Sequence, residues 1–171
     1  LTVRRGVHPM YDYGPLQPAA EARRALGLPG SGPVFLCFGF IRPYKGLEVL
    51  LDAWPRVVAV QPDARLVVAG ECYGPFAPYQ AQIQALGIEE SVHVVERYIA
   101  DSEVAAFFSA ADAVVQPYRS ATQSGVAQIA YHFERPMVVT DVGGLAEIVP
   151  HERAGLVVPP NAPAPLADAL L

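Results

Sequence analysis

The sequence is poor in cysteine, in long apolar runs and in basic charge. Two cysteines, Cys37 and Cys72, are too few for the disulfide framework of a small secreted domain or for a cysteine-rich zinc cluster. No apolar run reaches the roughly 18 residues that a membrane-spanning helix needs. A net charge of −5 argues against broad nucleic-acid binding, which usually requires a basic surface. These absences predict a cytoplasmic protein that binds no nucleic acid.

Both ends of the sequence have the features of a fragment. The first residue is leucine rather than methionine, and the last residues, APLADALL, stop inside a helical pattern. We expect residues 1–14 to be a linker or crossover segment that leaves another, N-terminal domain. Residues 15–171 are of a suitable length for one folded domain, which would be truncated in its last helix.

Apolar segments of strand length alternate with helical patterns along the chain. We expect strands at 33–40, 64–70, 91–96, 112–117, 136–141 and 155–160, and helices at 19–27, 46–60, 76–86, 102–110, 124–134, 144–149 and the chain end. The strand segments are almost continuous in valine and leucine, as in parallel sheets that are buried on both faces. The sequence therefore predicts an α/β, Rossmann-like fold, in which a doubly wound six-stranded parallel sheet carries helices on both faces.

Ligands of such folds bind at the carboxyl ends of the strands, so the residues that follow each strand are the candidates. After the first strand, RPYKG sends Arg42 and Lys45 out of one turn beside the start of a helix. Two cations at a helix N-terminus suit the binding of a diphosphate. The arginine can donate two hydrogen bonds to one phosphate, and the lysine supplies a compact positive charge. The alternative is a solvated turn whose basic residues bind nothing.

After the fourth strand, a polar run, SATQSG, leads into a helix. Free backbone N–H groups at that helix start, with small residues allowing close approach, form a cradle for an anion. We therefore predict ligand contacts from Thr122, Gln123, Ser124 and Gly125. The alternative is ordinary N-capping by Thr122 or Ser124, for which a single residue would be enough.

Other binding chemistries have weaker support. GxxxxGK[ST] is absent, and no GxGxxG follows the first strand. The four histidines have no metal-ligand spacing, and no carboxylate pair follows a strand. We therefore expect no metal and no cofactor.

The ordered set of motifs resembles the carboxyl-terminal domain of GT-B-fold glycosyltransferases, and more closely the family-four (group 1) retaining enzymes. The motifs are GxxRxxKG from Gly39 to Gly46, AGE from 69 to 71, Asp112 with Pro117, VVTDVGGLAEIV from 138 to 149 and GLVVPP from 155 to 160. The resemblance runs from about 33 to 171, and HPMYD at 8–12 is similar to the segment that enters this domain.

The resemblance implies that residues 15–171 bind a UDP- or GDP-sugar donor, and that a missing N-terminal domain supplies most of the acceptor site and any membrane contact. It places Arg42 and Lys45 on the donor diphosphate. It also places Arg97 and Tyr98 near the nucleotide base, and we add Glu71 and Gln128 as weaker base or ribose contacts.

The chain departs from that family at one point. Two glutamates eight positions apart usually accompany the fourth strand–helix turn, one near the sugar and one on the ribose, and Ala121 and Ile129 hold those positions here. Gln123 or Gln128 would be a partial substitute. Two hypotheses follow: the donor-binding half of a retaining glycosyltransferase, inactive by itself, or a non-catalytic nucleotide- or sugar-binding domain on the same fold.

Overall fold

The computed structural model describes residues 12–171, so that the greater part of the expected linker, 1–14, lies outside the described residues. The strands are β1 Val34–Phe38, β2 Arg65–Ala69, β3 Val92–Val95, β4 Ala113–Gln116, β5 Met137–Thr140 and β6 Gly155–Val158. The helices are α1 Ala19–Ala25, α2 Leu47–Val60, α3 Ala77–Leu86, α4 Asp101–Ala110, α5 Gly125–His132, α6 Leu145–Ile148 and α7 Pro163–Leu170, with 3-10 turns η1 Pro43–Lys45 and η2 Glu89–Ser91.

The six strands form one sheet in the order β3-β2-β1-β4-β5-β6, and every neighbouring pair is parallel. The predicted doubly wound fold is therefore confirmed. The strand order reverses between β1 and β4: after β1 the chain continues to β2 on one side, and after β4 it continues to β5 on the other side. A crevice forms at such a point, outside the carboxyl ends of the two strands.

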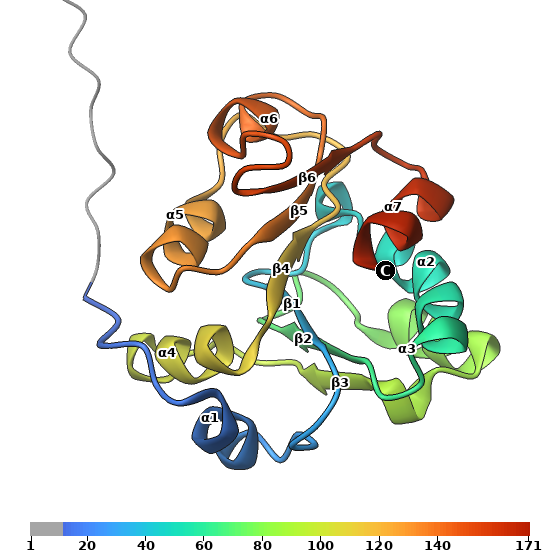
Figure 1. Ribbon diagram of the computed structural model, residues 1–171. Helices are drawn as coiled ribbons and strands as arrows, with labels where there is room; N and C mark the ends of the chain where they lie inside the picture. Colours follow the sequence, from blue (N-terminus) through green and yellow to red (C-terminus); the bar gives the residue numbers. More distant parts are fainter. Residues whose placement is uncertain (1–11) are drawn as a thin grey trace, which may run out of the picture.

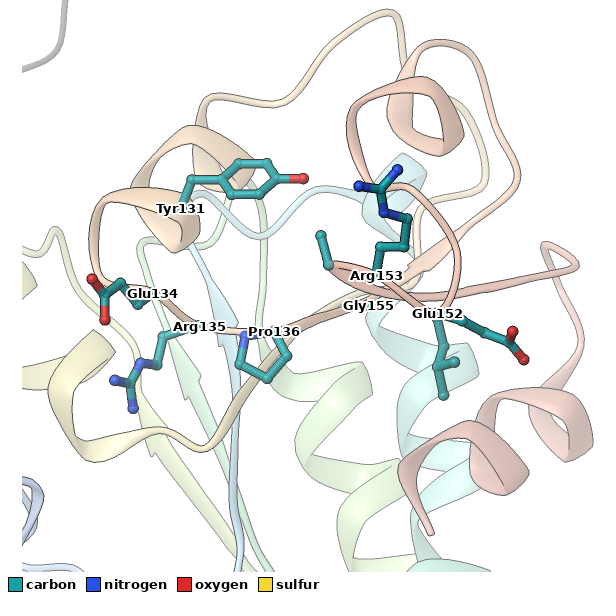
Figure 2. Close-up of a pocket in the computed structure, with 9 residues that line it drawn as sticks. Tyr131, Glu134, Arg135, Pro136, Glu152, Arg153 and Gly155 are labelled. Carbon is teal, nitrogen blue, oxygen red and sulfur yellow. The ribbon is translucent and has the colours of Figure 1, made fainter.

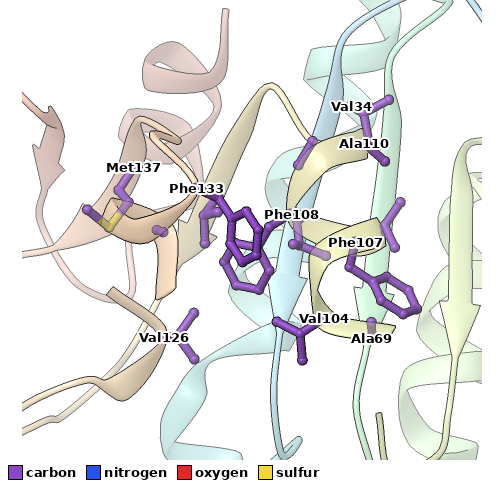
Figure 3. Close-up of a cluster of buried hydrophobic side chains, with 14 of the residues drawn as sticks. Val34, Ala69, Val104, Phe107, Phe108, Ala110, Val126, Phe133 and Met137 are labelled. Atoms are coloured by element: carbon purple, nitrogen blue, oxygen red, sulfur yellow. The ribbon is translucent and has the colours of Figure 1, made fainter. Parts of the chain in front are cut away.

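Helices cover both faces of the sheet (Figure 1). One face carries α1, α4, α5 and α6, and the other carries α2, α3 and α7. On the first face, Phe108 of α4 and Phe133, which follows α5, lie side by side in the buried cluster (Figure 3). The ring of Phe108 lies 5.5 Å from that of Phe133 and 5.0 Å from that of Phe38, measured between centroids.

The second face is built around Trp54 of α2, which is fully buried. Its ring meets Phe35 of β1 edge to face at 5.7 Å. Its indole N–H donates to the hydroxyl of Ser91 at 2.9 Å, and this hydroxyl donates in turn to the carbonyl of Ile88. The polar atom of the tryptophan is therefore satisfied inside an apolar layer.

Glycines end the first two strands earlier than the sequence patterns predict. Gly39 and Gly70 have φ values of 91° and 151°, and a side chain at Gly70 would come within 2.2 Å of the Gly39 carbonyl oxygen. The two chain segments can approach so closely only because Gly70 has no Cβ. This close approach lies at the carboxyl edge of the sheet, where the candidate site is.

Elsewhere the boundaries differ from those expected by at most two residues. The helix expected at 102–110 starts at Asp101, because the Ala100 N–H donates to the Glu103 carboxylate and closes the first turn. Among residues 12–171, no helix has the length and apolar character needed to cross a bilayer.

Candidate functional site

The loops that follow β1 and β4 are joined at the point where the strand order reverses. The N–H of Arg119 donates to the carbonyl of Tyr44 at 2.7 Å. Gly46 faces the carbonyl of Pro117 so closely that a Cβ would lie 2.1 Å from its oxygen. The loop containing RPYKG and the loop that leads into SATQSG therefore lie side by side. The region between them, at the carboxyl ends of β1 and β4, is the crevice expected at such a switch point.

Lys45 lies inside this crevice, half-buried. Its ammonium nitrogen is 5.5 Å from the centroid of the Tyr118 ring. A side chain at Gly39 would meet that nitrogen at 3.3 Å and the Val126 side chain at 3.5 Å. The Lys45 charge is thus close to the first turn of α5. Burial, opposed by Cys37 and assisted by Arg42, lowers the pKa of Lys45.

Arg42 lies on an aromatic surface at the rim of the crevice. Its guanidinium carbon is 4.0 Å from the ring centroid of Tyr73 and 5.9 Å from that of Phe40. These two rings contact each other edge to face at 5.2 Å. Tyr73 and Phe40 are 57% and 38% exposed, so the aromatic surface is open to solvent.

Neither cation is neutralised by the protein. Within residues 12–171, the ion pairs involve other side chains, and neither Arg42 nor Lys45 has a carboxylate partner. The N-terminus of α5 adds a partial positive charge to the same crevice. Positive charges that lie together without counter-charge favour the binding of an anion. Because Arg42, Lys45 and the start of α5 are separate groups, they could contact more than one phosphate group.

The start of α5 is not capped by a side chain. Ser124, the N-cap residue, has no capping hydrogen bond. Its buried hydroxyl instead donates to the side-chain oxygen of Gln116 on β4. Gly125, the first residue of the helix, is exposed. The N-capping interpretation of this segment is therefore wrong, and the first N–H groups of α5 are left without the partner that a cap would supply.

The exposed residues Thr122 and Gln123 are held by the loop that follows β5. The N–H of Gly144 donates to the carbonyl of Thr122 at 3.1 Å. Gly143, with φ of 50°, leaves room for the carbonyl of Ala121, which would lie 1.6 Å from a Cβ at that position. These contacts tie the polar run to the loop that follows β5.

A shallow hollow adjoins the crevice and shares Gly39 with it. Glu71 and Tyr98, both predicted from the sequence, contribute to its wall. The remaining lining residues are mainly apolar: Tyr13, Phe38, Gly39, Phe40, Gly70, Ile99, Asp101, Val104 and Ile129. A flat, partly apolar group linked to an anion in the crevice would fit this arrangement.

Two of the predicted residues lie elsewhere. The guanidinium of Arg97 forms a two-pronged ion pair with the carboxylate of Glu103 and donates to the carbonyl of Tyr98. Gln128 is half-buried on α5 and does not line the hollow, whereas Ile129 does. The structure therefore does not bring Arg97 and Gln128 into the site in this conformation.

A second hollow lies at the opposite end of the sheet, at the amino ends of β5 and β6 (Figure 2). Its four charged side chains, those of Glu134, Arg135, Glu152 and Arg153, balance one another. Arg135 is already bonded to the carbonyls of Phe133 and Ala111. This hollow therefore lacks the unbalanced positive charge that distinguishes the crevice.

Sequence reasoning missed the aromatic surface under Arg42 and the link from Ser124 to Gln116. Tyr73 follows the second expected strand, which is the signal that could have indicated it, whereas Phe40 falls inside the strand expected at 33–40. Gln116 gives no such signal, because it lies within an otherwise apolar strand segment. The partner of Gln116 is Ser124, and the two meet only because the start of α5 packs against β4.

The six parallel strands with helices on both faces define a Rossmann-like domain. Residues 32–171 match the family model of glycosyl transferases group 1. The chain therefore belongs to the group 1 glycosyltransferase family, as its motifs indicated.

Individual relatives agree with this assignment. The chain is similar to the D-inositol 3-phosphate glycosyltransferase of Corynebacterium glutamicum, with 31% identity over 94% of this chain and 40% of that protein. It is also similar in structure to sucrose-phosphate synthase of Thermosynechococcus elongatus, with a TM-score of 0.80 and 29% identity over 91% of this chain and 39% of that one. A structure of Anabaena HepE in complex with UDP and glucose gives a TM-score of 0.74 and 25% identity over 88% and 40% of the two chains. The chain spans less than half the length of these relatives.

Proposed function

We propose that this chain is the donor-binding half of a retaining glycosyltransferase, which transfers a sugar from a nucleoside-diphosphate sugar to an acceptor. The observation that carries the proposal is the pairing of Arg42 and Lys45, without counter-charge, beside the uncapped N-terminus of α5. The diphosphate of the donor would lie there, and its nucleoside would extend into the hollow lined by Glu71 and Tyr98. UDP bound to the related HepE chain supports a uridine donor, with a GDP-sugar as the alternative.

The acceptor would bind elsewhere in the full-length protein. Glycosyl transfer needs the donor carbon and the acceptor hydroxyl to be held together in a site shielded from water. Arg42, Lys45 and the start of α5 would supply the phosphate contacts from this chain, and none of them would bind an acceptor hydroxyl. We therefore propose that an N-terminal domain forms the opposite wall, and that the present chain folds by itself but transfers no sugar.

We also propose that binding needs neither a divalent metal nor a cofactor. Mg²⁺ at a phosphate site usually requires one or two carboxylates. Glu71 and Asp101, the acidic residues that line the hollow, would have to be shared with the nucleoside. Phosphate charge would instead be met by Arg42, Lys45 and the backbone of Ser124 and Gly125. Addition of EDTA should leave UDP affinity unchanged, and loss of binding that Mg²⁺ restores would contradict this.

Calorimetric titration of the chain with UDP and with GDP tests the main proposal. Bonds to charged groups contribute about 1.5–3 kcal/mol each, so the double variant Arg42→Ala/Lys45→Ala should lose at least about tenfold in affinity. Arg24→Ala/Arg153→Ala is the matched control, because it removes the same charge from exposed positions away from the crevice. Equal losses in the two variants would reduce the effect to general electrostatics and overturn the assignment.

One observation favours the second candidate, a non-catalytic nucleotide-binding domain. Ala121 and Ile129 occupy the two positions where the family resemblance leads us to expect glutamates, and neither has a side chain able to hydrogen-bond. Transfer of labelled sugar by the full-length protein, with the anomeric configuration of the product read by NMR, distinguishes the candidates. UDP binding without any transfer would favour the non-catalytic domain.

A further inference from the structure

The side chain of Arg42 is held by aromatic rings rather than by a carboxylate. Its guanidinium carbon lies 4.0 Å from the centroid of the Tyr73 ring, with Phe40 at 5.9 Å. The Nε atom is buried without a hydrogen-bond partner. Burial of an unpaired N–H costs free energy, so the attraction of the ring for the cation must offset that cost.

The backbone fixes Tyr73 opposite Arg42. The N–H of Ile41 donates to the carbonyl of Glu71 at 2.8 Å, and the N–H of Tyr73 donates to the carbonyl of Ile41 at 3.0 Å. Ile41 and Cys72 form a parallel bridge beyond the ends of β1 and β2. The ring is therefore carried by an extension of the sheet and not by a free loop.

An arginine held in this way has less conformational entropy to lose when it binds. Its side chain carries about 2 kcal/mol of rotamer entropy, part of which is lost on binding to a phosphate. A flat ring face restricts the guanidinium to one plane before the ligand arrives, and such preorganisation increases affinity. No hydrogen bond or ion pair within residues 12–171 competes for the Arg42 guanidinium.

We propose that Tyr73 is a positioning residue for Arg42, which it holds on its ring face for contact with the donor diphosphate; this rests on the proposed function. Phe40 supports the ring of Tyr73 from the side. The tyrosine hydroxyl has no part in this role, so the aromatic face alone should be sufficient. Tyr73 itself does not contact the phosphates.

The experiment is a double-mutant cycle on the chain, with UDP as the probe and calorimetry as the readout. Tyr73→Leu removes the ring, and UDP affinity should fall by about threefold to tenfold, as expected for a cation–π contact. Tyr73→Phe keeps the ring and should remain within about twofold of the parent chain. In the Arg42→Ala background, Tyr73→Leu should cause no further loss.

Other outcomes separate this inference from the proposed function. If Arg42→Ala weakens UDP binding and Tyr73→Leu does not, the positioning role is wrong and the proposed function stands. If Tyr73→Leu weakens binding equally with and without Arg42, Tyr73 contacts the ligand directly and the inference is overturned. If Arg42→Ala has no effect, the proposed function itself fails. Tyr131→Leu, which removes an exposed ring from the hollow at the amino ends of β5 and β6, is the control, and thermal unfolding verifies that each variant is folded.

Discussion

The backbone N–H of Arg119 donates to the carbonyl of Tyr44, and this bond joins the loops that follow β4 and β1. The two residues are far apart in the sequence and follow different strands, β4 and β1. The bond keeps the loop that carries Lys45 beside the loop that leads into α5. Gly46 lies next to it, against Pro117.

Replacement of Gly46 by alanine should destabilise the domain and weaken UDP binding. The residue has φ of 66°, and its Cβ would lie 2.1 Å from the carbonyl oxygen of Pro117, so that the two loops must separate. Gly87→Ala is the matched control, with φ of 64° and no atom within 4 Å. The left-handed conformation alone costs roughly 1–2 kcal/mol, and overpacking adds about 1–3 kcal/mol at Gly46. Urea unfolding measures the loss of stability in both variants, and equal losses in Gly46→Ala and Gly87→Ala would contradict the close packing at Gly46.

Ser124→Ala should cost about 1–3 kcal/mol, because it leaves the buried side-chain oxygen of Gln116 without its donor. Since α5 is anchored to β4 through this bond, UDP affinity should fall as well. Ser120→Ala, at an exposed position of the same loop, is the control and should change neither quantity. Thermal unfolding and calorimetry on the two variants decide the question, and an unaffected Ser124→Ala variant would show that the hydroxyl is dispensable.

Lys45 should make UDP binding dependent on pH in the alkaline range. Burial lowers its pKa below the usual 10.5, so the ammonium loses its proton at a lower pH than a solvated lysine. UDP affinity should therefore fall as pH rises through that lowered pKa. Without ligand, stability should rise over the interval from the lowered pKa up to 10.5, because there the unfolded chain binds more protons.

The control for this prediction is Lys45→Arg, which stays protonated and should flatten the pH profile. Measurements start above about pH 7.5, where the phosphate, with a second pKa of about 6, no longer titrates. A parent chain and an arginine variant with the same alkaline profile would exclude Lys45 as the titrating group.

Glu103 should contribute to stability at neutral pH and lose that contribution in acid. The bidentate bond from Arg97 and the N–H of Ala100 lower the pKa of Glu103 from 4.5 to about 2. The contribution is present above pH 4.5 and is lost as the pH falls toward about 2. Glu103→Gln should therefore reduce the difference in urea midpoint between pH 7 and pH 3. Glu89→Gln, at an exposed position, serves as the control, and the same acid sensitivity in parent and Glu103→Gln chains would refute the assignment.

The sequence by itself determined the order of the elements and the residues that follow each strand. Nearly continuous apolar strands alternating with helical patterns leave few arrangements other than a parallel sheet covered on both faces. Arg42 and Lys45 were predicted as phosphate contacts for the same reason, because RPYKG comes directly after a strand at the sheet edge where ligands bind. These inferences depend only on local pattern and on chain connectivity.

The partners of individual side chains were decided by the tertiary structure. The sequence does not say that β4 pairs with β1, yet this pairing brings the polar run beside Lys45. Ser124 turns inward to Gln116, Arg97 turns to Glu103, and Arg42 lies on Tyr73. In each case the side-chain rotamer depends on a partner group that folding brings near. The free energy of that contact exceeds any rotamer preference of the local sequence. Side-chain direction, and therefore the composition of the site, is a property of packing.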